Sequence, residues 1–230
     1  MSTHDQLFQQ GRLLHRNLRD TNICYRTIED EVVGMLVEFA NAIDIDDNAL
    51  EPRSHMTAIR ALQSIRSLED AAAPRSPLDD WESLLYLIIF LGAYGINEEE
   101  RRAFFVRQQE SREPPLAYWI TGEVAATIAA HKRKDMHCAD AFDEAVSPIM
   151  PAGPLYDLAV AIHGVLFCHP GCAGARGRSQ ALRRARQAFN RDNPGAEFIP
   201  PRNLIDPLVL RDEYVEEIVA ALLLVLADHR

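Results

Sequence analysis

A short polar run near the start of the chain holds side chains that could take part in phosphate chemistry. It reads Leu14-His15-Arg16-Asn17-Leu18-Arg19-Asp20-Thr21-Asn22-Ile23. The guanidinium of Arg19 could hold a phosphate group, because it presents charged donors in a fixed fork. Asn17 cannot take up a proton at any physiological pH, because its side chain is a neutral amide. A solvated charge explains Arg19 equally well. The run therefore offers a side chain that could bind an anion, two residues from a position that cannot act as a base.

Two short apolar stretches after this run predict a β-hairpin. They cover Ile23 to Arg26 and Val32 to Val37, and the polar turn Glu29-Asp30-Glu31 joins them. Apolar runs of this length on either side of a tight polar turn are typical of two paired strands. The tripeptide Glu38-Phe39-Ala40 follows the second stretch.

These segments resemble the fungal-type protein kinase family. Its catalytic loop has His-Arg-Asp with an Asn five residues after the Asp, and Asp-Phe-Gly follows a hairpin. The family also carries an Asp-Asp-Leu/Trp-Glu-Ser-Leu helix. The matching segments here are His15-Arg16-Asn17, Glu38-Phe39-Ala40 and the helix that opens Pro77-Leu78-Asp79-Asp80-Trp81-Glu82-Ser83-Leu84-Leu85-Tyr86. The resemblance is strong from about Leu7 to Arg102 and patchier to about Cys172.

The resemblance assigns chemical roles to four positions, and three of them have changed. Asn17 stands where the family has its catalytic base, and Arg19 where kinases have a Lys that contacts the transferred phosphate. Asn22 and Glu38 stand at the two magnesium-ligand positions, where Glu38 is one methylene longer than the usual Asp. Asp20 is a weak substitute base three residues after Asn17. ATP and magnesium are cofactors by family resemblance only, and none is expected for the chain as given.

Four further motif positions are expected to serve packing. In the family fold the His and Phe that correspond to His15 and Phe39 stack in an internal spine, and Arg16 belongs to the same motif. Asp80 is expected at the start of a helix that caps the backbone of the catalytic loop from below. An acid at a helix N-terminus is also favourable on its own account.

The fold class expected from the sequence is mainly α, a protein-kinase-like C-terminal lobe with one small β-hairpin within Ile23 to Val37. The central helix should lie near Leu84 to Leu91, where no polar face remains. The other expected helices run from Asn97 to about Gln109, Ala117 to Lys134, Phe142 to Ile149, Leu155 to Phe167, Arg176 to Arg191 and Pro207 to His229. The second of these is expected to bury Trp119, Ile120, Val124 and Ile128.

The domain expectation is one kinase-like lobe over residues 1–172, with a helical extension over 173–230 packed on it. Only 14 residues precede His15. No Gly-rich phosphate loop is found there, so an N-terminal lobe is not expected in this chain.

The net charge of the chain limits the kinds of partner that it can bind. The chain has a formal net charge of -10, which argues against nucleic acid and anionic membranes as partners. Its hydrophobic content of 47% is enough for a packed core.

The basic helix around Arg176 to Arg191 is better explained as a solvated face than as a phosphate site. Cys168-His169-Pro170-Gly171-Cys172 offers metal-type side chains, but a structural loop is favoured over a zinc site. The four cysteines suggest no disulfide framework. With no signal region and no long apolar run, the expected location is intracellular, cytoplasmic or nuclear.

Two functions from different classes follow. The first is a catalytically inactive pseudokinase that acts by binding protein, and the second is an ATP-dependent Ser/Thr phosphotransferase whose missing lobe comes from a fuller gene product or another chain. A decaying gene product without a selected role stays open as a third. The binding interpretation expects an apolar surface around Leu7, Phe8, Ile23 and Val37, available to a protein partner or a second copy.

Overall fold

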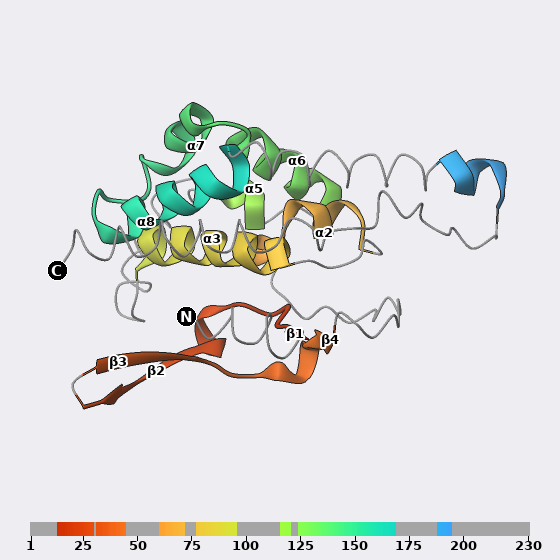
Figure 1. Ribbon diagram of the computed structural model, residues 1–230. Helices are drawn as coiled ribbons and strands as arrows, with labels where there is room; N and C mark the ends of the chain where they lie inside the picture. The colour runs from red at the N-terminus through yellow and green to blue at the C-terminus, as the bar shows by residue number, and fades with distance from the viewer. Residues whose placement is uncertain are drawn as a thin grey trace.

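The structure is a computed structural model that describes residues 13–29, 31–44, 60–71, 77–95, 116–120, 124–168 and 188–194. The described chain is mostly helical, with a small two-stranded antiparallel hairpin near its N-terminus, and this confirms the expected fold class. The strands form one layer and the helices the other, as Figure 1 shows. No helix in these described ranges has the length and apolar character needed to cross a bilayer.

The hairpin consists of β2 (Ile23–Ile28) and β3 (Glu31–Leu36). Their register places Tyr25 opposite Gly34 and Thr27 opposite Val32. Because side chains alternate between the faces of a strand, Tyr25 and Val32 lie on the same face of the hairpin. A second, two-residue pair joins β1 (Leu13–Leu14) to β4 (Ile43–Asp44), and this pairing was not expected from the sequence.

The central helix is α3 (Pro77–Tyr94), which confirms the prediction of a buried helix over Leu84 to Leu91. Two acids, Asp79 and Asp80, occupy its first turn, where they complement the helix dipole. The helix ends where Gly95 takes a φ of 94° and its N–H bonds to Leu91 O at 3.0 Å. A left-handed residue favours glycine and closes the helix end. The side chains of Leu87 and Ile88 are buried, as the apolar periodicity requires.

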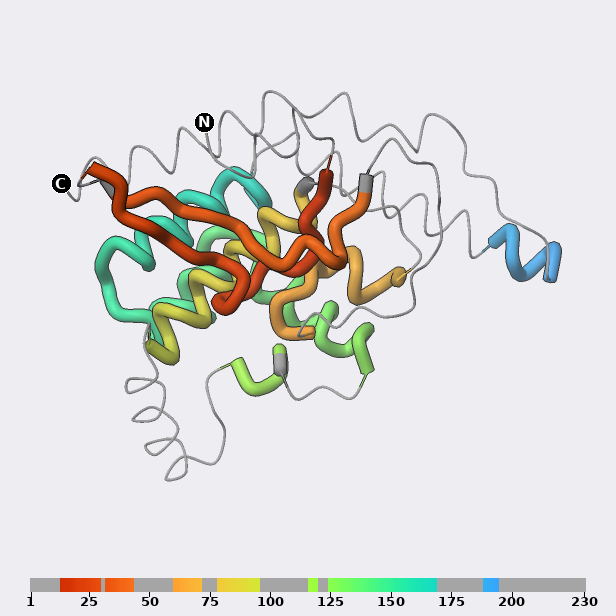
Figure 2. Tube along the Cα trace, turned by 90° about the horizontal axis from the view of Figure 1, so that it is seen from below, coloured from red at the N-terminus to blue at the C-terminus, as the bar shows by residue number. Residues whose placement is uncertain are grey.

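The other helices pack above α3, on the side away from the strands (Figure 1), and Figure 2 shows the hairpin crossing the opposite side. They are α2 (Ile65–Glu69), α5 (Ala117–Ile120), α6 (Ala125–Met136), α7 (Ala139–Val146) and α8 (Pro154–His163). Helix α8 packs against α3, and α2 packs against α6. A π-helical turn η4 (Gly164–Cys168) follows α8 directly.

One expected helix is wrong in its extent. The stretch Ala117 to Lys134 forms the separate helices α5 and α6, and Val124 is 59% exposed rather than buried. Val124 has extended backbone angles (φ -108°, ψ 124°) as the N-cap of α6, so it leaves the helical face that Ile128 continues. Trp119 and Ile128 are buried as predicted.

Other helix boundaries differ modestly or lie outside the described residues. Helix α7 begins three residues before Phe142 and ends at Val146, and α8 begins at Pro154. The helices expected over Asn97 to Gln109 and Pro207 to His229 lie outside the described residues. Of the basic helix expected over 176–191, only 188–191 are described, within a helical turn at 188–192.

A lysine lies in the helical core and ties α6 to the segment before α2. Lys132 is fully buried, and its Nζ donates to Ala61 O at 2.6 Å and to Gln63 O at 2.8 Å. The ammonium also lies 3.6 Å from the centroid of the Tyr86 ring, a cation–π distance. Burial lowers the pKa of Lys132 well below its ordinary value, while the carboxylate of Glu82 acts in the opposite direction. Two backbone carbonyls and an aromatic face thus replace its water shell.

Candidate functional site

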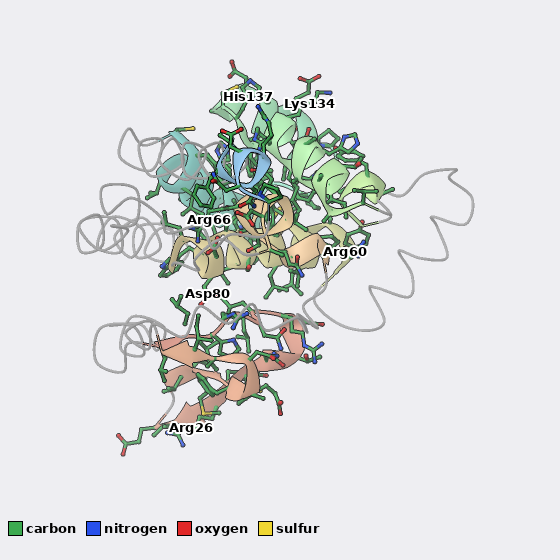
Figure 3. The ribbon with its side chains drawn as sticks, turned by 90° about the vertical axis from the view of Figure 1, so that its right-hand side faces the viewer. Arg26, Arg60, Arg66, Asp80, Lys134 and His137 are labelled. Carbon is green, nitrogen blue, oxygen red and sulfur yellow. The ribbon has the colours of Figure 1, made fainter. Side chains whose placement is uncertain are left out.

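Asp80 fixes the backbone of the polar run to the start of α3. The carboxylate is buried, and its Oδ2 accepts the N–H of His15 at 2.9 Å. Its Oδ1 accepts the N–H of Arg16, also at 2.9 Å. Arg16 has a φ of 64°, a left-handed conformation that is unfavourable for a side chain of this size. The two charge-assisted bonds help to hold this strained backbone in place, at the boundary between helices and strands where Figure 3 shows Asp80.

His15 links the polar run to the end of β3 and to Phe39. Its ring is buried, and Nε2 lies 2.9 Å from Val37 O. Because a carbonyl only accepts, the Nε2 position carries the hydrogen, and Nδ1 accepts the N–H of Asn17 at 3.3 Å. The Phe39 ring contacts the His15 ring edge-on, with 4.9 Å between centroids. The structure therefore brings His15, Phe39 and Asp80 together around the run.

Asn17 and Asn22 are both buried and form the interior of the run. Asn22 Nδ2 donates to Asn17 O at 2.8 Å, and the backbone O of Asn22 accepts the N–H of Val37 at 3.0 Å. The side-chain Oδ1 of Asn17 is buried, and within the described structure no hydrogen-bond donor reaches it. An amide in this position can accept a hydrogen bond but cannot remove a proton.

Arg19 and Asp20 each form a hydrogen bond within the polar run. Arg19 Nε donates to Asn22 Oδ1 at 3.4 Å, so its guanidinium is directed in part at the neighbouring amide. Asp20 Oδ1 accepts the N–H of Thr21 at 3.0 Å at the start of η1 (Asp20–Asn22). Asp20 thus contacts its own turn, and the bonds described for Asn17 involve His15 and Asn22 instead.

Glu38 is exposed, at a sharp bend between β3 and η2 (Phe39–Asn41). Its backbone is left-handed, with φ 64° and ψ 59°. This conformation costs about 1 kcal/mol for a residue with a Cβ, so the surrounding contacts must hold it. The bonds of Val37 to His15 and Asn22 fix the residue just before the bend.

The donor set around Asn22 and Glu38 does not fit a resident magnesium ion. Magnesium requires several oxygen ligands in a tight octahedron. The amide oxygen Asn22 Oδ1 already accepts from Arg19 Nε and from Thr21 Oγ1, at 3.4 and 3.2 Å, which uses its two lone pairs. Among the described residues, no group of three or more His, Cys, Asp and Glu could hold a metal ion.

The residues that hold the polar run in place all lie in the part of the chain that matches a known protein family. Residues 1–91 match the fungal protein kinase family. The match covers the polar run, the hairpin, the Glu38-Phe39-Ala40 segment and most of α3, including Asp80 and the His15 and Arg16 backbone that it binds. No curated protein and no solved structure matches the chain. The fungal protein kinase match therefore supports a kinase-like domain without specifying a substrate.

The apolar surface expected from the sequence is exposed only in part, and its most exposed side chains were not predicted. Leu7 and Phe8 lie outside the described residues, Ile23 is 38% exposed, and Val37 is half-buried. The most exposed apolar side chains of the hairpin are Tyr25 at 75% and Val32 at 71%. The signal was present, because alternate residues of a hairpin share a face and Tyr25 and Val32 fall on the same one.

Proposed function

We propose that this chain is a catalytically inactive, kinase-like protein that acts by binding protein through the β2–β3 hairpin. The observation that carries the proposal is the contrast between a retained scaffold and altered chemical positions. Asp80, His15 and Phe39 still hold the run in a defined geometry. Asn17, at the position of the base, is an amide whose oxygen is buried. A kinase-like C-terminal lobe that is built but cannot abstract a proton is suited to recognition rather than transfer.

The binding surface we propose is the hairpin face that carries Tyr25 and Val32. Both side chains are largely exposed, so covering them with a partner would remove apolar surface from water, which is favourable. Tyr25 lies opposite Gly34, which has no side chain to cover the ring. The partner would be a protein. A second copy of this chain is the partner that can be tested with the purified chain alone, by measuring self-association. We propose an intracellular location, cytoplasmic or nuclear, for this activity.

Replacing Val32 by Lys should weaken this association, because it places a charge in the apolar contact. Sedimentation equilibrium over a wide concentration range should show an average mass for the unaltered chain that rises with concentration. For Val32→Lys the dissociation constant should rise about tenfold or more, since burying an unpaired charge costs at least 1.4 kcal/mol.

Val124→Lys is the matched control, because Val124 is also exposed and lies on the helical side of the molecule. It should associate as the unaltered chain does. A chain that stays monomeric at every concentration, or an equal effect of the two substitutions, would count against binding through the hairpin.

The alternative function is ATP-dependent Ser/Thr phosphotransfer, with the nucleotide lobe supplied by a fuller gene product or another chain. One observation favours it: the loop backbone is held at three points, by Asp80, by His15 and by Asn22. Catalysis requires a loop whose backbone is held in a fixed geometry. Another residue would have to serve as the base in place of Asn17, and Asp20 is the carboxylate that the polar run offers.

A further inference from the structure

A cysteine and a histidine form a pair at the junction of α6 and α7, on the helical side of the molecule. Cys138 Sγ lies 3.3 Å from His137 Nε2. The other ring nitrogen, Nδ1, lies 2.6 Å from Lys134 O in the last turn of α6. Figure 3 shows Lys134 and His137 at the end of the molecule farthest from the strands. This pair is separate from the polar run and from the hairpin.

The carbonyl of Lys134 fixes which nitrogen of His137 carries the hydrogen. A carbonyl oxygen only accepts, so the hydrogen must be on Nδ1. Nε2 then has its lone pair directed at the thiol and is able to accept the S–H proton. A nucleophile beside a base that a third group orients is the arrangement that activates a thiol. Here the third group is a backbone carbonyl.

The helix that follows adds a second, independent contribution. Cys138 is the N-cap of α7, with extended backbone angles (φ -155°, ψ 169°), and its side chain caps no N–H of the helix. The first-turn N–H groups of a helix carry partial positive charge and stabilise an anion placed there. A thiolate on Cys138 would lie at this positive end. Asp140, also in the first turn of α7 and exposed, is the nearby charge that opposes it.

Cys168 and Cys24 offer internal comparisons. Cys168 Sγ lies 4.0 Å from His163 Nδ1, and Cys168 is the last residue of the π-helical turn, where the helix dipole disfavours a thiolate. Cys24 lies on β2 opposite Met35. All three thiols are free in the structure. Distance and helix direction together therefore rank Cys138 above Cys168, and both His-paired thiols above Cys24.

We propose that Cys138 is a site of reversible thiol modification by small disulfides, with His137 as its proton acceptor. The proton of Cys138 Sγ passes to His137 Nε2, and the thiolate attacks one sulfur of the small disulfide. A new S–S bond forms as the old one breaks, and the leaving thiolate takes the proton back from the imidazolium. Cys138 is oxidised, one sulfur of the reagent is reduced to a thiol, and no other reactant is needed.

The test uses oxidised glutathione on the full chain carrying Cys172→Ser, so that the three described cysteines are the only thiols. Mass spectrometry of the peptides over time gives one rate for each cysteine. At pH 7, Cys138 should react about tenfold faster than Cys168, and His137→Gln should slow Cys138 about tenfold while leaving Cys168 unchanged.

A pH profile separates activation from mere exposure. At pH 6, 7 and 8 the Cys138 rate in the unaltered chain should exceed that in His137→Gln, because only the unaltered chain places a proton acceptor beside the thiol. His137 is exposed, so the substitution should leave the fold intact. Equal rates at Cys138 and Cys168, or a Cys138 rate that His137→Gln does not change, would overturn the proposal.

Discussion

Asp80→Asn should destabilise the protein by about 3 kcal/mol, because one of two backbone donors, one buried and one partly buried, loses its charged acceptor. The carboxylate accepts from His15 N with one oxygen and from Arg16 N with the other. An amide offers only one oxygen, so its NH₂ group would meet an N–H group. The strained backbone of Arg16 would then lose part of its support. Denaturant unfolding measures the free-energy loss, and amide exchange at His15 and Arg16 measures the local release.

Asp140→Asn provides the control for this substitution. Asp140 is also an acid in the first turn of a helix, but it is exposed. Its loss should cost no more than about 1 kcal/mol, the size of a helix-dipole contribution. If the two variants unfold at the same denaturant concentration, Asp80 does not anchor the polar run as described.

Lys132→Met should cost about 3 kcal/mol, because the buried carbonyl of Ala61 and the partly buried carbonyl of Gln63 lose the Lys132 ammonium as a donor. The Met side chain fills a similar volume and isolates the loss of the polar contacts. Lys134→Met, two residues along the same helix and exposed, should stay within about 0.5 kcal/mol of the unaltered chain. Equal stability of the two variants would show that the buried contacts of Lys132 contribute nothing.

The contribution of Lys132 should also depend on pH. Burial lowers its pKa in the folded protein below the ordinary 10.5 of the unfolded chain. Between these two pKa values the unfolded chain binds more protons than the folded protein does, so the free energy of unfolding rises with pH. This contribution is lost as pH falls through the pKa of the folded protein. The free-energy gap between the unaltered chain and Lys132→Met should therefore widen as pH is raised toward 10.5. A gap that narrows would contradict the direction of the pKa shift.

The sequence predicted those parts of the molecule whose geometry is local or is carried by a motif. The hairpin follows from two short apolar stretches and a polar turn, and α3 follows from a helix with no polar face. The positions around the polar run follow from the family resemblance, which supplied the long-range relation between His15 and Asp80 that no local pattern contains. Boundaries were less predictable, since Val124 continues the periodicity of Ile128 but has an extended backbone.

Features that depend on tertiary packing were missed. Lys132 stands among His131, Arg133 and Lys134, a charged stretch that is typical of a solvated helix face. Only its spacing of four from the buried Ile128 could have indicated an inward position. The β1–β4 pair involves two residues on each side, too few to produce an alternating pattern. The Cys138–His137 pair lies between the end of α6 at Met136 and the start of α7 at Ala139. The helix boundaries predicted from the sequence lie too far from these two residues to indicate the pair.

The measurement that tests the central claim most directly is transfer of labelled phosphate from ATP, with magnesium or manganese, by the purified chain. Protein substrates and the chain itself serve as acceptors, and an active kinase in parallel reactions shows that the assay works. Asp20→Ala marks the background, because Asp20 is the remaining carboxylate of the polar run. We expect no transfer above that background, since the position of the base holds the amide of Asn17. Transfer by the unaltered chain that disappears in Asp20→Ala would contradict the account and identify Asp20 as a working base.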